Sequence, residues 1–234
     1  MGFYGIICGA GGAVQVDPNK ANLPLLSTGT FYNLVKDDPM GHYYEQTVST
    51  PNGEIVAACA FRPISDCYST VVCGRDPNGK YTKVIGMNGS GGAFQYAIYS
   101  QTAQENPSGY GMVIYDGDSG VVFSSKNRYP KIRNVLLVDR TYLRTPPRYI
   151  DIVHGVPNAY FIVPRVQGLE YFEYVNGQGY QGYVQHLVDV GLQKINDTTV
   201  RVGLLDEYIF RVWTTFELPW DYTPRVIRIA VCEL

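Results

Sequence analysis

One serine in this chain stands in a setting that nucleophilic catalysis uses. Ser119 lies in the run Gly117-Asp-Ser-Gly120, whose small residues allow a tight turn that presents a side chain. Acyl transfer at such a serine needs a histidine base and a carboxylate that orients the base. The one histidine that precedes Ser119 is His42, in the run Met-Gly-His-Tyr-Tyr.

The Gly117–Gly120 run resembles the nucleophile loop of chymotrypsin-like serine proteases, which are also all-β, so a serine hydrolase is the enzymatic alternative. His42 lacks the Ala-Ala-His-Cys context that this resemblance requires. A similar turn near the start of the chain reads Gly-Ala-Gly-Gly and has no serine. We therefore expect that the protein is not an enzyme and that the Ser119 turn joins two strands of a hairpin.

Metal and cofactor sites are also disfavoured. Asp116 and Asp118 have the spacing of a calcium loop, but no bidentate glutamate follows as a helix–loop–helix site requires. Cys67 and Cys73 are further apart than the usual zinc pair. The odd number of cysteines and their uneven spacing favour buried, reduced thiols over a disulfide framework. We expect no cofactor. The five cysteines are Cys8, Cys59, Cys67, Cys73 and Cys232.

Residues 126–148 concentrate positive charge in a chain whose net charge is −2. The stretch holds seven cations, and its one acid is Asp139. Two interpretations stay open: solvated strand faces and a loop, or a docking surface for an acidic subunit or a polyanionic surface glycan. Nucleic acid is the least favoured partner because no groove-reading motif is present. The cations are Lys126, Arg128, Lys131, Arg133, Arg140, Arg144 and Arg148.

The segment 171–183 is rich in Tyr, Gly and Gln. Because aromatic rings stack on sugar faces, the segment could form a glycan platform. It could equally form an interface between subunits, since tyrosine combines a large contact area with a polar tip. A long hairpin without either role is the third possibility. The tyrosines concerned are Tyr171, Tyr174, Tyr180 and Tyr183.

The elements that hold these residues are predicted to be strands. The composition, with 20 Tyr, 25 Gly and 14 Pro, favours short strands joined by turns. Runs of six to eight residues alternate between apolar and polar types and end at turn residues, which predicts an all-β antiparallel fold of sandwich type. Residues 183–192 fit either a helical turn or another strand. The runs are 54–61, 80–85, 93–99, 199–204, 208–213 and 225–231.

An internal repeat divides the chain. Tyr4–Val16 and Tyr110–Phe123 both read as Tyr-Gly, an apolar strand, a Gly-rich turn and a second apolar strand, which is a hairpin pattern. Pro51-Asn-Gly and Pro157-Asn-Ala each precede a strand, and residues 80–99 resemble residues 199–215. The repeat predicts two tandem related antiparallel β-sandwich-like modules, residues 1–106 and 107–234, with a joint at 105–109.

The second hairpin carries a resemblance to a known class of proteins. Tyr110–Ser125 resembles a segment of tail-associated proteins of long-tailed bacteriophages: aromatic-Gly-Leu, an apolar strand, Asn/Asp-x-x-Gly, a second strand and Phe-Asp-Ser, with Ser124 at the position of the aspartate. Tyr4–Asp17 is similar and keeps the aspartate. The resemblance implies a β-sandwich protein of the tail tip or fibre region and carries no catalytic residues.

We therefore expect a bacteriophage virion structural protein, a tail-tip, baseplate or fibre-attachment component that is made in the bacterial cytoplasm and acts in the virion tail. Its expected partners are other tail subunits, in a homo-oligomer or ring. A host-receptor or glycan-binding module is the alternative. No membrane insertion is expected, because no apolar run approaches the roughly 18 residues that a spanning helix needs.

Overall fold

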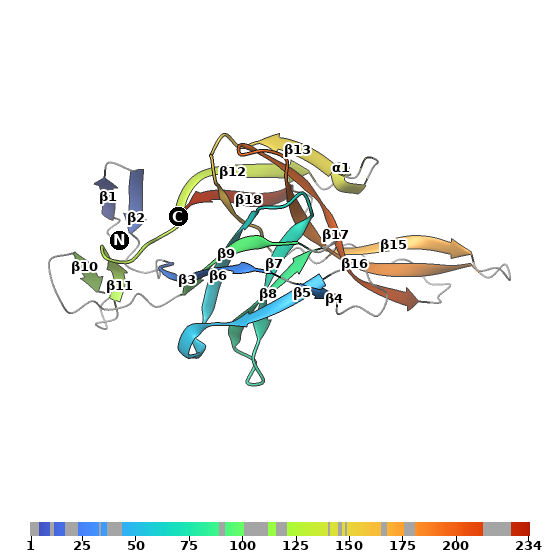
Figure 1. Cartoon of the computed structure of the whole chain (residues 1–234), viewed down its shortest axis with the longest axis horizontal. Helices are drawn as coiled ribbons and strands as arrows, with labels where there is room; N and C mark the ends of the chain where they lie inside the picture. The colour runs from blue at the N-terminus through green and yellow to red at the C-terminus, as the bar shows by residue number, and fades with distance from the viewer. Residues whose placement is uncertain are drawn as a thin grey trace.

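The computed structural model confirms the all-β fold class. The described elements are strands, apart from the 3-10 turn η1 (Pro51–Gly53) and one helical turn, α1 (Thr141–Arg144). Two antiparallel sheets pack face to face (Figure 1). The structure describes residues 5–9, 12–16, 23–32, 34–36, 44–88, 92–100, 112–115, 121–139, 141–144, 147, 149–164, 168–175, 181–212 and 226–234.

The two sheets have six and eight strands. The order in the six-stranded sheet is β12 (Lys131–Asp139), β18 (Val226–Glu233), β14 (Tyr160–Ile162), β6 (Val56–Pro63), β9 (Phe94–Ser100) and β3 (Leu25–Phe31). The order in the eight-stranded sheet is β13 (Tyr149–Val153), β17 (Thr199–Val212), β16 (Gln181–Lys194), β7 (Ser69–Arg75), β8 (Tyr81–Asn88), β5 (Tyr44–Ser49) and β4 (Val35–Lys36). The eighth strand, β15 (Gly168–Val175), pairs with β16.

The strand order shows that the two halves of the chain have the same topology. Strands β3, β5, β6, β7, β8 and β9 go in turn to the six-, eight-, six-, eight-, eight- and six-stranded sheet. The second half visits the two sheets in the same order, with strands β12, β13, β14, β16, β17 and β18. In each sheet, the order of equivalent strands is therefore the same when it is counted from either edge. This is the arrangement expected for two copies related by an approximate two-fold axis. This confirms the tandem, related, sandwich-like modules. The joint at 105–109 lies outside the described residues, so the boundary there stays a prediction.

The halves meet edge to edge and share one core. One paired position joins them in each sheet: Phe61 of β6 with Phe161 of β14, and Ser69 of β7 with Leu192 of β16. A single cluster of buried side chains runs through both halves between the sheets and includes Phe61 and Leu192, both fully buried. Separate cores would have allowed the halves to unfold independently, whereas a shared core couples them.

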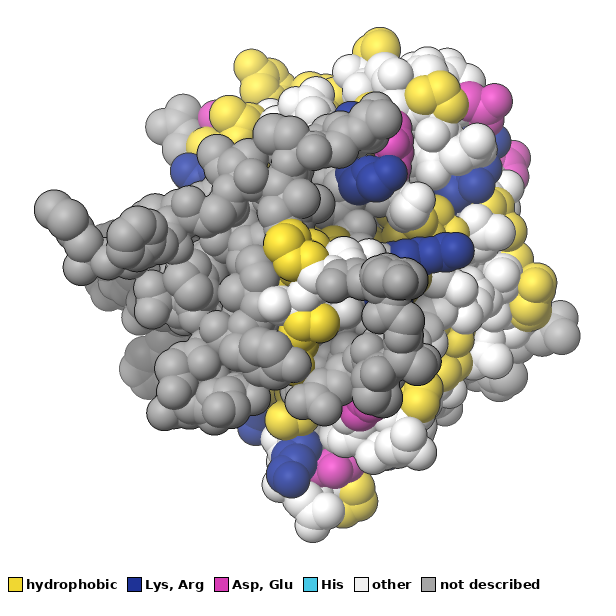
Figure 2. Space-filling model, turned by 90° about the vertical axis from the view of Figure 1, so that its left-hand side faces the viewer, with side chains coloured by type: hydrophobic (Ala, Val, Ile, Leu, Met, Phe, Trp, Pro, Cys, Tyr) yellow, Lys and Arg dark blue, Asp and Glu magenta, His cyan; other side chains and the backbone are white. Residues whose placement is uncertain are grey.

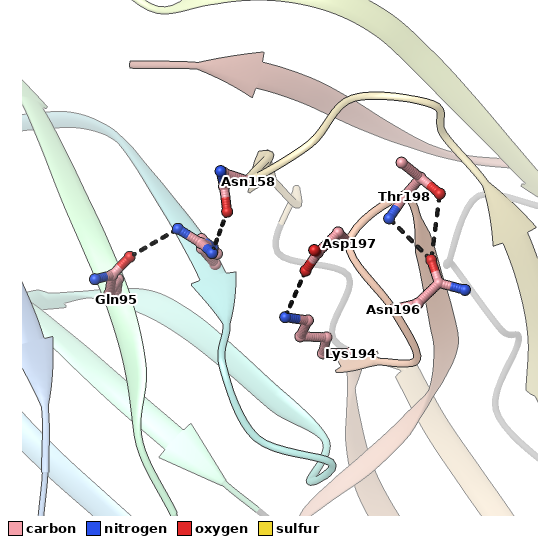
Figure 3. A network of polar contacts seen from close by, with 7 residues as sticks. Gln95, Asn158, Lys194, Asn196, Asp197 and Thr198 are labelled. Atoms are coloured by element: carbon pink, nitrogen blue, oxygen red, sulfur yellow. Dashed lines mark hydrogen bonds and ion pairs between the residues drawn. The ribbon is translucent and has the colours of Figure 1, made fainter.

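Polar contacts also cross the joint (Figure 3). The Arg62 guanidinium of β6 donates to Gln95 Oε1 and to Asn158 Oδ1, and Figure 3 labels both of these acceptors. Asn158 lies just before β14, so this contact ties the first half to the second. In the neighbouring turn between β16 and β17, the Lys194 ammonium lies 2.8 Å from the Asp197 carboxylate.

The two Pro-Asn turns are equivalent in the structure. Asn52 has φ of 52° and Asn158 has φ of 57°, the left-handed region that asparagine tolerates better than most residues. Each turn is anchored by a backbone bond to the start of a hairpin strand: the Thr50 N–H donates to Thr82, and the His154 N–H donates to Thr198. A strand follows each turn, as the sequence predicts.

The two opening hairpins are confirmed as antiparallel pairs. β1 (Gly5–Gly9) pairs with β2 (Gly12–Val16), and β10 (Val113–Tyr115) pairs with β11 (Val121–Ser124). Each forms a two-stranded sheet of its own, and both lie at the left-hand end of the molecule in Figure 1. The turn residues 116–120, which include Ser119, lie outside the described residues.

The predicted similarity between residues 80–99 and 199–215 is wrong. Residues 80–99 hold β8 and β9, which belong to different sheets, whereas residues 199–212 form one continuous strand, β17. The counterpart of β9 is β18, much later in the chain. The long strand persists because a register shift at Glu207, a β-bulge, keeps it paired with β16 on both sides of the acidic residues that suggested a turn.

The second half also carries an arm that the first half lacks. β15, the first part of β16 and the last part of β17 extend together beyond the sandwich at the right of Figure 1. Residues 183–192, for which helix and strand were both open, are therefore strand, within β16. The extra chain in this arm is why the repeat offset drifts after the opening hairpins.

Candidate protein interface

Strand β12 is an open edge of the six-stranded sheet. It pairs along its length with β18, and no described strand pairs with its other side. The Val135 N–H donates to the Asn134 side-chain oxygen at 2.8 Å, so it points to the open side and not to β18. Since N–H groups alternate in direction along a strand, the Leu137 N–H points the same way. An edge of this kind is a template for pairing with another chain.

The same strand displays apolar side chains to solvent. Ile132, Val135 and Leu137 are 59%, 46% and 65% exposed. Leu136 and Val138, which alternate with Val135 and Leu137, are buried in the core between the sheets. A β-bulge between Ile132 and Asn134 brings Ile132 to the same face as Val135 and Leu137. The exposed residues therefore form a row on the outer face, which we call the β12 row. Three large apolar residues exposed together on an open edge are unusual for a surface that faces only water.

Basic side chains accompany the β12 row. Lys126 and Arg128 lie in the turn before β12, Lys131 and Arg133 lie in the strand, and all four are exposed. Figure 2 looks onto the end of the molecule where β12 begins and shows Lys and Arg side chains beside exposed hydrophobic ones. Of the seven predicted cations, Lys131 and Arg133 therefore lie on this edge strand, and Lys126 and Arg128 lie in the chain that leads to it, where the Arg128 carbonyl accepts a hydrogen bond from the Leu25 N–H of β3. Arg144 lies in α1 with its side chain undescribed, and Arg140 and Arg148 lie outside the described residues.

Two acids are engaged locally around these cations. Arg133 pairs with Glu233 of β18 at 2.7 Å, and its hydrogen bond lowers the pKa of the Glu233 carboxyl. Asp139 ends β12 and accepts hydrogen bonds from the N–H and the hydroxyl of Thr141, the first residue of α1, at 2.9 and 2.7 Å. Strand β12 therefore begins with the cation Lys131 and ends with the acid Asp139.

The two ends of the Tyr-rich segment lie in paired strands, an arrangement that is compatible with all three interpretations. β15 and β16 pair antiparallel, which places Tyr171 opposite Gln185 and Glu173 opposite Tyr183. On the next strand Phe210 of β17 is opposite Gln185. Tyr174 is opposite Gly182, in a row of the other face, and Tyr180 lies outside the described residues. The roles as glycan platform or subunit interface stay predictions.

A hollow that the sequence did not reveal lies on the outer face of the eight-stranded sheet. It has a volume of about 340 Å³ and is lined by residues of β5, β7 and β8, among them Arg75, Tyr81 and Met87. The Arg75 guanidinium lies 4.6 Å from the centre of the Tyr81 ring and donates to its hydroxyl at 2.7 Å. One face of the exposed aromatic ring is thus already covered, which weakens the hollow as a stacking site for a sugar. Arg75 and Tyr81 meet because they flank the turn between β7 and β8, a proximity that requires the hairpin register.

The cavity at the joint is too small for an organic ligand. It measures about 20 Å³, room for about one water molecule, and His154, Arg62 and Lys194 are among its lining residues. Burial lowers the pKa of His154, whose ring packs edge-on against Phe161 at 5.1 Å. Its Nδ1 accepts a hydrogen bond from the Val156 N–H. His154 is therefore a neutral, packed histidine of the joint.

The structure adds nothing to an enzymatic or metal-binding interpretation within the residues that it describes. His42 and Ser119 lie outside these residues. Across the described ranges, no three His, Cys, Asp or Glu side chains are placed to hold a metal ion together. Cys59 and Cys232 are buried free thiols, as expected, and burial raises the pKa of Cys232 to about 11. Cys67 and Cys73 form no disulfide and are half-buried.

A membrane-spanning helix is also absent from the described part of the chain, where no helix has the length and apolarity to cross a bilayer. Comparison with protein-family models, with curated proteins and with solved structures finds no match. The exposed β12 edge, the basic residues and the short hairpin resemblance are therefore the features of the chain that point to a function.

Proposed function

We propose that this protein is a structural subunit that works by assembling with other protein chains through the open edge of β12. The observation that carries the proposal is the β12 row: three exposed apolar side chains on an edge strand whose Val135 N–H faces outward. Such an edge binds an additional strand by main-chain hydrogen bonds and apolar contact together. The exposed cations beside it add attraction for a partner that presents acids.

We further propose that the assembly is the tail of a long-tailed bacteriophage, in the tail-tip, baseplate or fibre-attachment region. The resemblance of the two opening hairpins to tail-associated proteins supports this, and both segments do form hairpins. Tail components repeat around closed symmetry axes, where subunits need strong lateral contacts. An open edge strand on a rigid double sandwich provides such a contact.

Mass spectrometry of purified virions tests the proposal directly. We expect the protein at a stoichiometry of several copies per particle, retained after washing at high salt. Cross-linking of intact particles should connect residues 126–139 to a neighbouring chain, whereas the exposed turn at Asp76–Lys80 serves as an internal reference. Absence from purified virions would end the tail assignment, and cross-links confined to the reference turn would end the role of β12.

Charge reversal tests the contribution of the basic residues. Lys131→Glu should slow association with the partner at low salt and less at high salt, because the range of these charges shrinks to about 8 Å at physiological ionic strength. Lys80→Glu, which changes one exposed cation in the other half, is the matched control. An equal effect of the two variants would show that only the net charge matters.

A glycan-binding role of the arm is the second candidate. It is favoured by the register, which puts Tyr171 and Phe210 in one row across the three strands and Tyr183 in the next row of that face. Tyr171→Ala and Tyr183→Ala should then abolish binding to host surface polysaccharide while incorporation into particles persists. Loss of incorporation with unchanged polysaccharide binding would assign the arm to a subunit contact instead.

A further inference from the structure

We infer that the partner at the β12 edge is a second copy of this chain, joined by antiparallel pairing of the two β12 strands about a two-fold axis at Val135. This inference rests on the proposed assembly function and names its occupant. The two six-stranded sheets would then form one continuous sheet of twelve strands. The backbone, the side chains and the architecture of the molecule each support this pairing.

The backbone of β12 fits a two-fold pairing centred on Val135. In an antiparallel pair the two residues of a hydrogen-bonded position exchange both of their N–H and C=O groups. Val135 faces the open side, as its hydrogen bond to the Asn134 side chain shows. Two copies can therefore exchange bonds between their Val135 residues, after the Asn134 side chain releases the N–H that it holds in the isolated chain.

The side chains are complementary in this register. With Val135 opposite its own copy, Leu137 faces Arg133 of the other copy, whose aliphatic stem can cover it. Beyond Arg133, where a β-bulge shifts the register of β12 by one residue, Lys131 lies close to Asp139 of the other copy, so opposite charges meet at both ends of the paired strands. Shifting the register by two residues would break this charge match. The row of Ile132, Val135 and Leu137 would become continuous across the two copies and partly leave water.

The molecule already contains a junction of this kind. Its two halves meet through β6 with β14 and through β7 with β16, in both cases edge to edge and antiparallel about an approximate two-fold axis. β12 belongs to the same sheet and is the edge that this internal junction leaves open. The opposite edge, β3, is half-buried along most of its length and does not offer the same surface.

Disulfide trapping tests the pairing with one matched control. Val135→Cys should form a symmetric disulfide dimer under mild oxidation, because Cα atoms at a hydrogen-bonded pair lie about 5.5 Å apart, within disulfide range. Thr28→Cys places a thiol on an exposed position of β3, the equivalent strand, and should yield at most a small amount of dimer. Both variants keep the same native cysteines, so the difference between them reports on β12. Equal trapping, or none at Val135→Cys, would overturn the inference.

Equilibrium sedimentation gives the second test without an introduced thiol. Leu137→Lys should weaken the dimer at least about tenfold, a change of about 1.4 kcal/mol. Lys131→Asp alone should weaken it less, and adding Asp139→Lys should restore part of the loss by exchanging the two charges. If the double variant fails to fold, Leu137→Lys and the trapping result still decide.

The outcomes separate this inference from the proposed function. A chain that sediments at a single chain mass at all accessible concentrations, yet is present in virions and cross-links to a different protein through β12, refutes the second copy and keeps the assembly role. A dimer that forms through β12 in a protein absent from virions keeps the pairing and refutes the tail assignment. Trapping of Val135→Cys to an acidic partner alone refutes the homodimer.

Discussion

Strands β3 and β12 are the equivalent ends of one duplicated sheet, yet their surroundings differ. β3 is half-buried along most of its length, and its Leu25 N–H donates to the Arg128 carbonyl at 2.6 Å. At Gly29, an added Cβ would meet the Tyr96 ring, so the chain and the ring lie in close contact. β12 exposes Ile132 and Leu137 by more than half. The equivalent strands of this duplicated fold thus differ in exposure, and this difference is why we propose β12 as the assembly edge.

The hairpins β7–β8 and β16–β17 give a second comparison between the halves. In the first half, the Asp76 carboxylate accepts bonds from the Asn78 and Lys80 N–H groups and closes a short turn. In the second half, Asn196 accepts a bond from the Thr198 N–H in the equivalent turn. The difference lies at the opposite ends of the strands, where β16 and β17 continue into the arm. The second half therefore differs from the first by its peripheral arm, whereas the turn between the two hairpin strands is similar in both halves.

The largest expected effect concerns the junction between the halves. Phe61→Ala and Phe161→Ala should each lower the free energy of unfolding by about 3–5 kcal/mol, because both rings are buried where β6 pairs with β14. The shared core predicts one cooperative transition for both variants, measured by denaturant unfolding with separate probes in each half. Two transitions, one for each half, would show that the modules fold independently.

The paired asparagines separate two contributions to the turns. Asn52→Ala and Asn158→Ala should both lose about 1 kcal/mol from the strain of alanine at positive φ. Asn158→Ala should lose roughly a further 1 kcal/mol because Arg62 loses an acceptor. Glycine at both positions removes the strain, so Asn52→Gly should be near wild type and Asn158→Gly should retain the second loss. Equal losses in the two alanine variants would mean that the Arg62 contact across the joint contributes nothing.

Acid should destabilise the second turn through His154. Burial lowers the folded-state pKa of His154 below its usual 6.5, so below about pH 6.5 the unfolded chain binds the proton more readily. Stability is therefore fully present above about pH 6.5 and falls as the pH drops toward the folded-state pKa. The equivalent position in the first half is Thr50, which does not titrate. His154→Gln should flatten the pH dependence between pH 5 and 7 by a fraction of the ~1.4 kcal/mol that one pKa unit represents. An unchanged pH profile would assign the acid sensitivity to other groups.

The smallest expected effect is the most informative about the β12 row. Leu137→Lys should change the stability of the isolated chain by less than about 0.5 kcal/mol, because the side chain is already exposed. Leu136→Ala, its buried neighbour, should cost about 2–5 kcal/mol. Comparable losses in the two variants, measured by thermal unfolding at low protein concentration, would mean that the row is packed within the chain.

The sequence predicted the class of fold and the tandem relation because alternating apolar residues and turn chemistry are local signals. It also predicted the equivalent turns at Asn52 and Asn158. It did not reveal the edge-to-edge junction, since a single pairing such as Phe61 with Phe161 leaves no pattern in either segment. The acidic residues near Glu207 were interpreted as a turn because a β-bulge and a turn use similar residue types.

The basic stretch shows how much of the candidate interface could be predicted from the sequence. Its charge was visible in the sequence, and the exposure of Lys126, Arg128, Lys131 and Arg133 agrees with both of the interpretations left open. The apolar part of the surface was not predicted. Positions 136 and 137 are both leucine, and only the pairing of β12 in the sheet determines that Leu137 and not Leu136 faces water. An edge strand is a property of the topology, and the local sequence does not specify it.

Amide hydrogen exchange on the free and the assembled protein tests the central comparison most directly. Peptides that cover residues 131–139 should become strongly protected on assembly, because the outward N–H groups at Val135 and Leu137 gain partners there. Peptides that cover residues 25–31 of β3 should exchange at the same rate in both states. Protection of β3 without protection of β12, or no change in either strand on assembly, would contradict the account.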